Sequence, residues 1–109
     1  MAVALRYLKK SEDLIWAAGA FGGGLGNKDL CGFLTGGEMA IGIYAGEQKL
    51  ERKAAKEICN LKGREFWQWW ISEAPLHCAE IREGRTDNKV CRRLGKLAAA
   101  KIEDLIRPA

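Results

Sequence analysis

Four cysteines stand out in this sequence, because thiols can carry out redox reactions or bind metal ions. They are Cys31, Cys59, Cys78 and Cys91, and they are spread over most of the chain. Their spacing contains no C-x-x-C pair, no zinc-ribbon pair and no haem-attachment motif. The spacing alone therefore gives little evidence for a metal site, and the position of each thiol on its predicted helix is the better guide.

Three of the four thiols lie where the sequence predicts the beginning of a helix. Cys31 follows the expected N-cap Asp29 by two residues, and Cys78 lies in the first turn after Pro75. Cys91 lies about one turn into the predicted last helix. Free N–H groups and the positive end of the helix dipole favour the thiolate, which is the reactive form of cysteine. We therefore expect these three thiols to have low pKa values.

Cys59 differs from the other three thiols. It lies near the C-terminal end of its predicted helix, where the dipole opposes a negative charge, and we interpret it as structural. Arginine also distinguishes the others, since Cys78 has Arg82 four residues later and Cys91 is followed directly by two arginines. The alternative is that all four cysteines pack as small apolar side chains in the core.

The segment 21–37, FGGGLGNKDLCGFLTGG, is rich in glycine and contains Cys31. Such a segment usually provides close approach or positive φ angles. A dinucleotide fingerprint does not fit, because the third glycine position falls on Asn27 or Asp29 and no strand precedes it, and no Walker motif occurs. The segment therefore predicts a helix stop, a turn and then a helix with Cys31 in its first turn.

The apolar pattern predicts an all-α fold of about five or six helices, in a single domain over residues 1–109. We expect no β-sheet. The predicted helices are one broken or two short helices over 2–20, a helix from Asp29 to about Tyr44, a charged helix that ends at Gly63, an aromatic helix over 64–74, a short helix after Pro75, and a last helix from about Asp87 to Ile106.

The predicted helix from Asp29 to Tyr44 should be the most buried, because two of its three stripes are apolar or made of small residues. Its third stripe consists of Cys31, Thr35, Glu38 and Gly42. This stripe either faces water or lines a functional groove. In the second case Glu38 lines the same groove as the thiol of Cys31 and can pass protons to it.

An aromatic run, FWQWWISEA, occupies the predicted helix over 64–74. Trp67, Trp69 and Trp70 cannot all point the same way, so we expect one of them to be exposed or to cover a partner. A homodimer would use this 66–71 surface. A helical interaction module with purely structural cysteines is accordingly one of the functions that the sequence allows.

The overall composition excludes several classes of protein. The net charge is +4, from 18 basic and 14 acidic residues that are mixed along the chain, which favours a solvated surface over a nucleic-acid interface. The longest run of low charge, 30–46, is too short and too polar to span a membrane. No secretory signal is visible, and we expect a cytoplasmic protein.

The residues carry a resemblance to a known family. The run GAFGGGLG, the run LCGFLTGGEMAIGIYAG and the later Cys78 and Cys91 resemble the C_GCAxxG_C_C family, small helical proteins to which redox activity is ascribed. The resemblance spans roughly Ala17 to Leu105, and its most specific part is the C-G-x-x-x-G motif that begins at Cys31. It implies that the motif cysteine of the family corresponds to Cys31, and its two C-terminal cysteines to Cys78 and Cys91.

The sequence departs from the family in two respects. The first cysteine of the family lies on a helix before the glycine run, whereas residues 1–20 contain no cysteine. That thiol was either lost or removed with a longer N-terminus. Phe33 also stands where the family usually has alanine. These differences leave a site of three thiols.

Two chemistries fit three converging thiols. In one, a reactive thiol attacks a disulfide or a peroxide and a second thiol resolves the product, with a redox protein or a small thiol or disulfide as partner. In the other, Cys31, Cys78 and Cys91 hold a metal ion or an iron–sulfur cluster, with an open fourth position or a nitrogen of His77. His77 adjoins Cys78, and neighbours on a helix point about 100° apart, so a capping or surface role suits it better.

Overall fold

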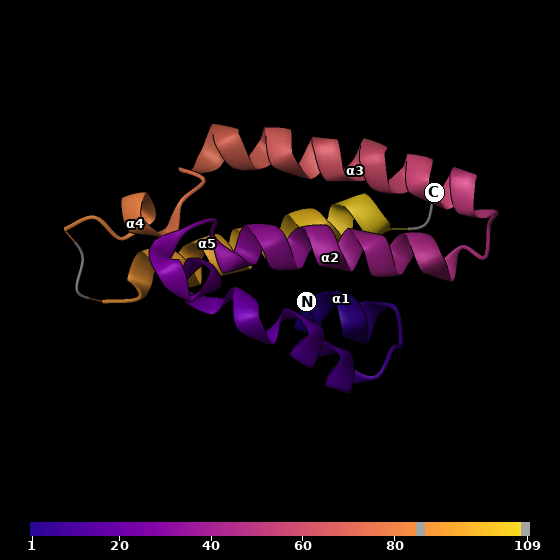
Figure 1. Ribbon diagram of the computed structural model, residues 1–109, viewed down its shortest axis with the longest axis horizontal. Helices are drawn as coiled ribbons and strands as arrows, with labels where there is room; N and C mark the ends of the chain where they lie inside the picture. Colours follow the sequence, from indigo (N-terminus) through magenta and orange to yellow (C-terminus); the bar gives the residue numbers. More distant parts are fainter. Residues whose placement is uncertain (85–86, 108–109) are drawn as a thin grey trace.

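Helices make up nearly all the regular structure of the chain. The computed structural model describes residues 1–84 and 87–107 (Figure 1). This part of the chain has no strand, so the prediction of an all-α fold is confirmed. Its elements are α1 (Ala2–Tyr7), the 3-10 helix η1 (Glu12–Phe21), the turn η2 (Gly24–Lys28), α2 (Gly32–Glu47), α3 (Arg52–Glu73), α4 (Cys78–Ile81) and α5 (Lys89–Ile106).

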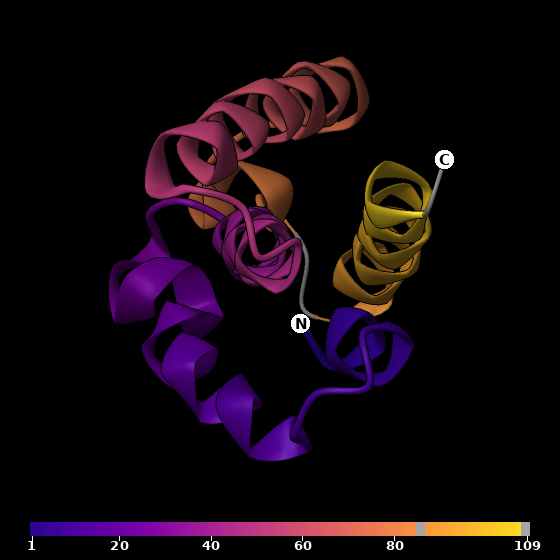
Figure 2. The ribbon, with the colours of Figure 1, turned by 90° about the vertical axis from the view of Figure 1, so that its right-hand side faces the viewer.

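Helix α2 lies at the centre of the molecule, with α3, α5 and η1 around it (Figure 2). Six of its residues are buried, more than in any other helix, which confirms the prediction from its apolar stripes. Small residues permit this close packing. A Cβ at Gly37 would lie 2.4 Å from the ring of Phe66 on α3, so only glycine fits there.

Helix α3 runs without a break through Gly63 and has 22 residues. The predicted division into a charged and an aromatic helix is therefore wrong. Gly63 is buried, and a Cβ there would lie 2.7 Å from Oε2 of Glu38 on α2. The glycine thus provides room for the neighbouring helix rather than ending its own.

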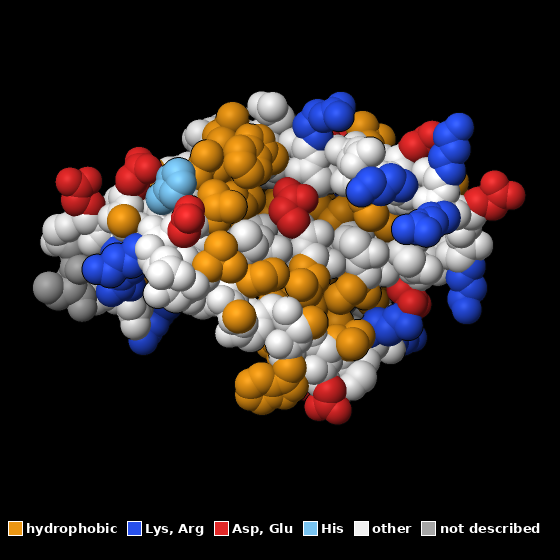
Figure 3. Space-filling model, in the orientation of Figure 1, with side chains coloured by type: hydrophobic (Ala, Val, Ile, Leu, Met, Phe, Trp, Pro, Cys, Tyr) orange, Lys and Arg blue, Asp and Glu red, His pale blue; other side chains and the backbone are white. Residues whose placement is uncertain are grey.

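The aromatic residues of α3 point in different directions, as expected. Phe66 and Trp70 are fully buried, whereas Trp67 is 38% and Ile71 49% exposed. Apolar side chains also appear across one face of the molecule, interrupted by charged ones (Figure 3). The indole N–H of Trp70 donates a hydrogen bond to the Pro75 carbonyl at 2.8 Å, which fixes the chain where it leaves α3.

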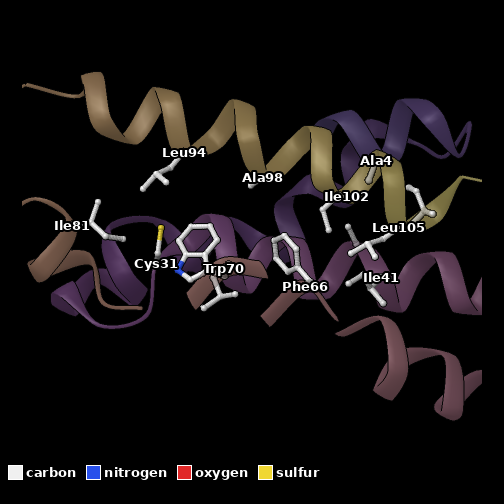
Figure 4. Packing of buried hydrophobic residues seen from close by; sticks show 13 residues of the cluster. Ala4, Cys31, Ile41, Phe66, Trp70, Ile81, Leu94, Ala98, Ile102 and Leu105 are labelled. Atoms are coloured by element: carbon white, nitrogen blue, oxygen red, sulfur yellow. The ribbon is translucent and has the colours of Figure 1, made fainter. Parts of the chain in front are cut away.

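Helix α5 contributes an apolar face with the predicted 3.6-residue period. Its buried residues are Leu94, Ala98, Ile102, Leu105 and Ile106. They pack against α2 and α3 in a single core cluster (Figure 4). Cys31 lies at one end of this cluster, near Ile81 and Trp70 (Figure 4).

The glycine run forms the turn that the sequence predicts. Gly23, Gly24 and Gly26 have positive φ angles, which glycine adopts without steric penalty. Gly24 is also a point of close approach, because a Cβ there would lie 2.5 Å from the Asp29 nitrogen and 2.8 Å from the Cβ of Cys78. The turn therefore lies directly against one of the predicted site residues.

The start of α2 differs from the prediction. Its N-cap is Cys31, in an extended conformation, and not Asp29. Asp29 instead belongs to the preceding segment, where its carbonyl accepts a hydrogen bond from the Cys78 N–H. No helix in the described part of the chain is long and apolar enough to cross a membrane.

Candidate thiol site

A short antiparallel bridge brings two of the predicted site cysteines together. Leu30, just before α2, pairs with His77, just before α4. The Cys31 N–H donates to the Leu76 carbonyl at 2.9 Å, and the Cys78 N–H donates to the Asp29 carbonyl at 2.7 Å. Two residues paired in this way have Cα atoms roughly 4.5 Å apart. The bridge therefore fixes the helix starts that carry Cys31 and Cys78 beside each other.

Three of the four thiols line one cavity of about 350 Å³. Cys31 comes from the start of α2, Cys78 from the start of α4 and Cys91 from the first turn of α5. The end of η1 and the glycine turn close the cavity on another side. The other lining residues are Ala18, Phe21, Gly22, Gly23, Gly24, Gly32, Phe33 and Arg82. Segments far apart in the sequence thus present three thiols to one space.

Arg82 is the one cation among the residues that line this cavity. One nitrogen of its guanidinium, Nη1, donates to Sγ of Cys91 at 3.3 Å and to Oδ1 of Asn88 at 2.7 Å. Asn88 holds the guanidinium in place, so its contact with the sulfur of Cys91 is fixed.

Cys31 is the most buried of the three, with 9% of its surface exposed. Burial raises the pKa of the Cys31 thiol, and hydrogen bonds from the backbone N–H groups of Phe33 and Leu34 only partly oppose this effect. The expectation of a low pKa at Cys31 is therefore wrong, because loss of hydration outweighs the helix N-terminus. Cys31 favours the protonated thiol, which suits it to a different role from that of Cys91.

Cys78 and Cys91 are half-buried and do lie at helix starts, as predicted. The two helices differ in length, however, since α4 has four residues and α5 has 18. The macrodipole grows from aligned peptide units, so a single turn provides little of it. The N-terminal end of a full helix dipole therefore lies at Cys91 and not at Cys78.

Cys59 lies away from the cavity and lines a separate groove of about 700 Å³ between α2 and α3, together with Arg52, Lys53 and Lys56. It is the eighth of the 22 residues of α3 and does not lie near a helix C-terminus, because α3 continues past Gly63. The expectation that Cys59 lies near the C-terminal end of its helix is therefore wrong. Its separation from the other thiols agrees with a structural interpretation.

Glu38 does not line the thiol cavity. It lies two helical turns beyond Cys31, and its carboxylate faces Gly63 of α3. Oε1 is buried and has no hydrogen-bond partner within the described residues. Burial raises the pKa of Glu38 to about 7. The structure therefore corrects the expectation that Glu38 shares a groove with the thiol.

His77 points to carboxylates rather than to thiols. Its Nδ1 lies 3.2 Å from Oε1 of Glu80, and its Nε2 lies 3.5 Å from Oδ1 of Asp29. It does not line the thiol cavity. Within residues 1–84 and 87–107, no three side chains of His, Cys, Asp or Glu are placed to hold a metal ion.

Sequence reasoning missed the contact of Arg82 with Cys91. The four-residue spacing pointed to Cys78 as the partner of Arg82, on the assumption that both lie on one regular helix. Because α4 ends at Ile81, Arg82 follows it in a non-helical conformation and reaches the sulfur on α5. Nothing in the local sequence indicates this turn of the chain.

Comparison with known proteins gives one match. The sequence model of a family described as "Putative redox-active protein (C_GCAxxG_C_C)" matches residues 1–105. No curated protein and no solved structure matches the chain.

Proposed function

The chain belongs to the C_GCAxxG_C_C family, and on that premise we propose that it carries out thiol–disulfide redox chemistry in the cavity lined by Cys31, Cys78 and Cys91. The observation that carries the proposal is the convergence of three thiols with one fixed guanidinium. A structural role alone does not require three cysteines from three helices to line the same space.

Cys91 is the attacking thiol in this proposal. It accepts a hydrogen bond from Arg82, it lies in the first turn of an 18-residue helix, and it is partly accessible. All three features favour Cys91 as the nucleophile among the three thiols. Cys91 attacks a sulfur of a disulfide or an oxygen of a peroxide, and the reduced part of the substrate leaves.

A second thiol completes the reaction. Cys31 or Cys78 attacks the oxidised sulfur of Cys91, a protein disulfide forms, and the remaining group departs with a proton. Two electrons pass from the two thiols to the substrate. The partner that later reduces the disulfide is a redox protein or a small thiol, and the cytoplasmic location expected from the sequence would keep the resting thiols reduced.

Alkylation of the reduced, metal-free protein tests this assignment. At pH 6 to 7, with a small reagent, mass spectrometry should find Cys91 labelled first and Cys59 later. Repetition in mild denaturant separates access from acidity, because denaturation removes differences in access. If Cys59 reacts first in the native protein, the proposed site is wrong.

A metal site formed by the same three cysteines would give a different experimental result. Anaerobic purification followed by metal analysis and an absorption spectrum would then find iron or zinc in proportion to the protein. The thiol proposal expects no visible cluster bands and no stoichiometric metal.

The exposed residues of α3 support a proposal about assembly. Trp67 and Ile71 leave apolar surface on the 66–71 segment, and we propose this surface as the contact of a homodimer. Sedimentation velocity should show a dimer that becomes monomeric in Trp67→Gln. A wild-type monomer at all concentrations would overturn this part of the proposal.

A further inference from the structure

A second cavity adjoins the thiol cavity. It has a volume of about 320 Å³ and lies between α1, η1, α2 and α5. Ala18, Gly32 and Phe33 line both cavities, so the two spaces meet at these residues. The ring of Phe33 lies at this junction and rests on α5, where a Cβ at Gly95 would come within 2.8 Å of it.

The walls of the second cavity are mostly apolar. They include Val3 of α1, Ile15 of η1 and Ile102 of α5. Met1, which carries a half-buried α-amino group, also lines the cavity. The thiol cavity has Arg82 as its one charged side chain, and Nη1 of Arg82 donates to Cys91 and Asn88. In the mostly apolar second cavity, an apolar group of a small molecule would be desolvated favourably.

From this adjacency we infer that the two cavities form one binding site, and that the oxidant that reacts with Cys91 is a hydroperoxide bearing an apolar group. The apolar group occupies the second cavity, and the O–O bond reaches the thiol cavity past Phe33. The inference rests on the proposed thiol function and specifies its substrate class.

The reaction balances with the groups present. The Cys91 thiolate attacks the terminal oxygen of the hydroperoxide, an S–O bond forms, and the O–O bond breaks. The alkoxide that leaves takes a proton from water and becomes an alcohol. Cys31 or Cys78 then attacks the sulfenic acid sulfur, a disulfide forms, and water leaves. The two thiols lose two electrons and the hydroperoxide gains them.

A small substrate agrees with the lining of the thiol cavity, where glycines and aromatic rings surround the thiols. Cys91 is half-buried, and Cys31 is only 9% exposed. A small hydroperoxide can enter this cavity without a change in the fold.

The test uses single-turnover oxidation of the reduced full-length protein, followed by the loss of alkylatable Cys91. Cumene hydroperoxide, which is apolar, is compared with hydrogen peroxide at equal concentration. Wild-type protein should react at least about tenfold faster with cumene hydroperoxide, since burial of a few apolar carbons supplies a factor of that order.

Two cavity-filling variants check that the preference arises in the second cavity. Ala99→Leu fills it from α5, and Ala100→Leu, on the exposed side of the same helix, is the matched control. Ile15→Trp fills it from η1, an element with no buried residue, and Leu14→Trp, whose side chain does not line it, is its control. Each filling variant should lose the preference and keep the hydrogen peroxide rate, whereas each control should keep both.

The outcomes separate the two proposals. Equal wild-type rates with both peroxides, or a preference that survives both filling variants, would overturn the inference but leave the thiol function standing. The same conclusion follows if Cys91 reacts with small disulfides and with neither peroxide. If Cys91 reacts with no peroxide and no disulfide, the proposed function itself fails.

Discussion

Arg82 and Cys91 are in contact although they belong to different elements of the fold. Arg82 follows the end of α4, and Cys91 lies in α5. The guanidinium Nη1 lies 3.3 Å from Sγ of Cys91, and its bond to Asn88 fixes it in that position. The contact singles out one of three neighbouring thiols. It also places the one cation that lines the cavity against Cys91, which is more exposed than the buried Cys31.

Replacement of Arg82 by methionine should slow the alkylation of Cys91 by about tenfold, because the variant loses the hydrogen bond that the guanidinium donates to the sulfur, worth on the order of 1.5 kcal/mol. Arg92→Met is the matched control, since Arg92 is exposed beside Cys91 and makes no contact with its sulfur. Equal slowing in both variants would indicate a general effect of charge, and the specific role of Arg82 would be disproved.

A second prediction concerns the glycine turn. Gly24→Ala should destabilise the protein by about 2 kcal/mol or more, because φ is +64° and the added Cβ would meet the Asp29 backbone and Cys78. It should also slow disulfide formation in the cavity, since Cys78 must shift. Gly22→Ala is the control, with open space around its Cβ and no positive φ. Urea denaturation and oxidation rates provide both readouts, and equal behaviour of the two variants would contradict the prediction.

Glu38 makes stability depend on pH. Its pKa in the folded chain is raised from 4.5 to about 7 by burial, so the folded state binds the proton more tightly than the unfolded state. The resulting stabilisation is fully present below pH 4.5 and is lost as pH rises through 7. As the pH rises from 5 to 8, the urea midpoint of the wild type should therefore decrease relative to that of Glu38→Gln.

Glu65→Gln serves as the control for this experiment, because Glu65 is an exposed carboxylate on α3. Its midpoint should follow that of the wild type at each pH. At pH 8 Glu38→Gln should be the more stable protein, since the amide carries no buried charge. A Glu38→Gln variant with the same pH dependence as the wild type would show that Glu38 is ionised in the fold at neutral pH.

The fold was predictable where local pattern decides it. The apolar pattern predicted a last helix over the stretch that forms α5, and the glycine run predicted the turn before α2. The division of α3 at Gly63 was wrong because a glycine can either end a helix or make room for a neighbouring helix. Here the packing of Glu38 against it outweighs its poor helix propensity, and only the position of α2 reveals this.

The sequence predicted which cysteines form the candidate site better than it predicted the role of each. Helix starts and the family pattern both selected Cys31, Cys78 and Cys91, and the three line one cavity. Their differences depend on tertiary structure. Burial raises the pKa of Cys31, and the chain after α4 brings Arg82 to Cys91. The spacing of the residues in the sequence indicates neither effect.

The most direct test of the thiol-redox account is disulfide mapping of the protein after mild oxidation, by proteolysis and mass spectrometry without reduction. The account predicts one intramolecular disulfide that joins Cys91 to Cys31 or Cys78, with Cys59 free. A disulfide that contains Cys59, or full retention of all four thiols after exposure to both a peroxide and a small disulfide, would contradict it.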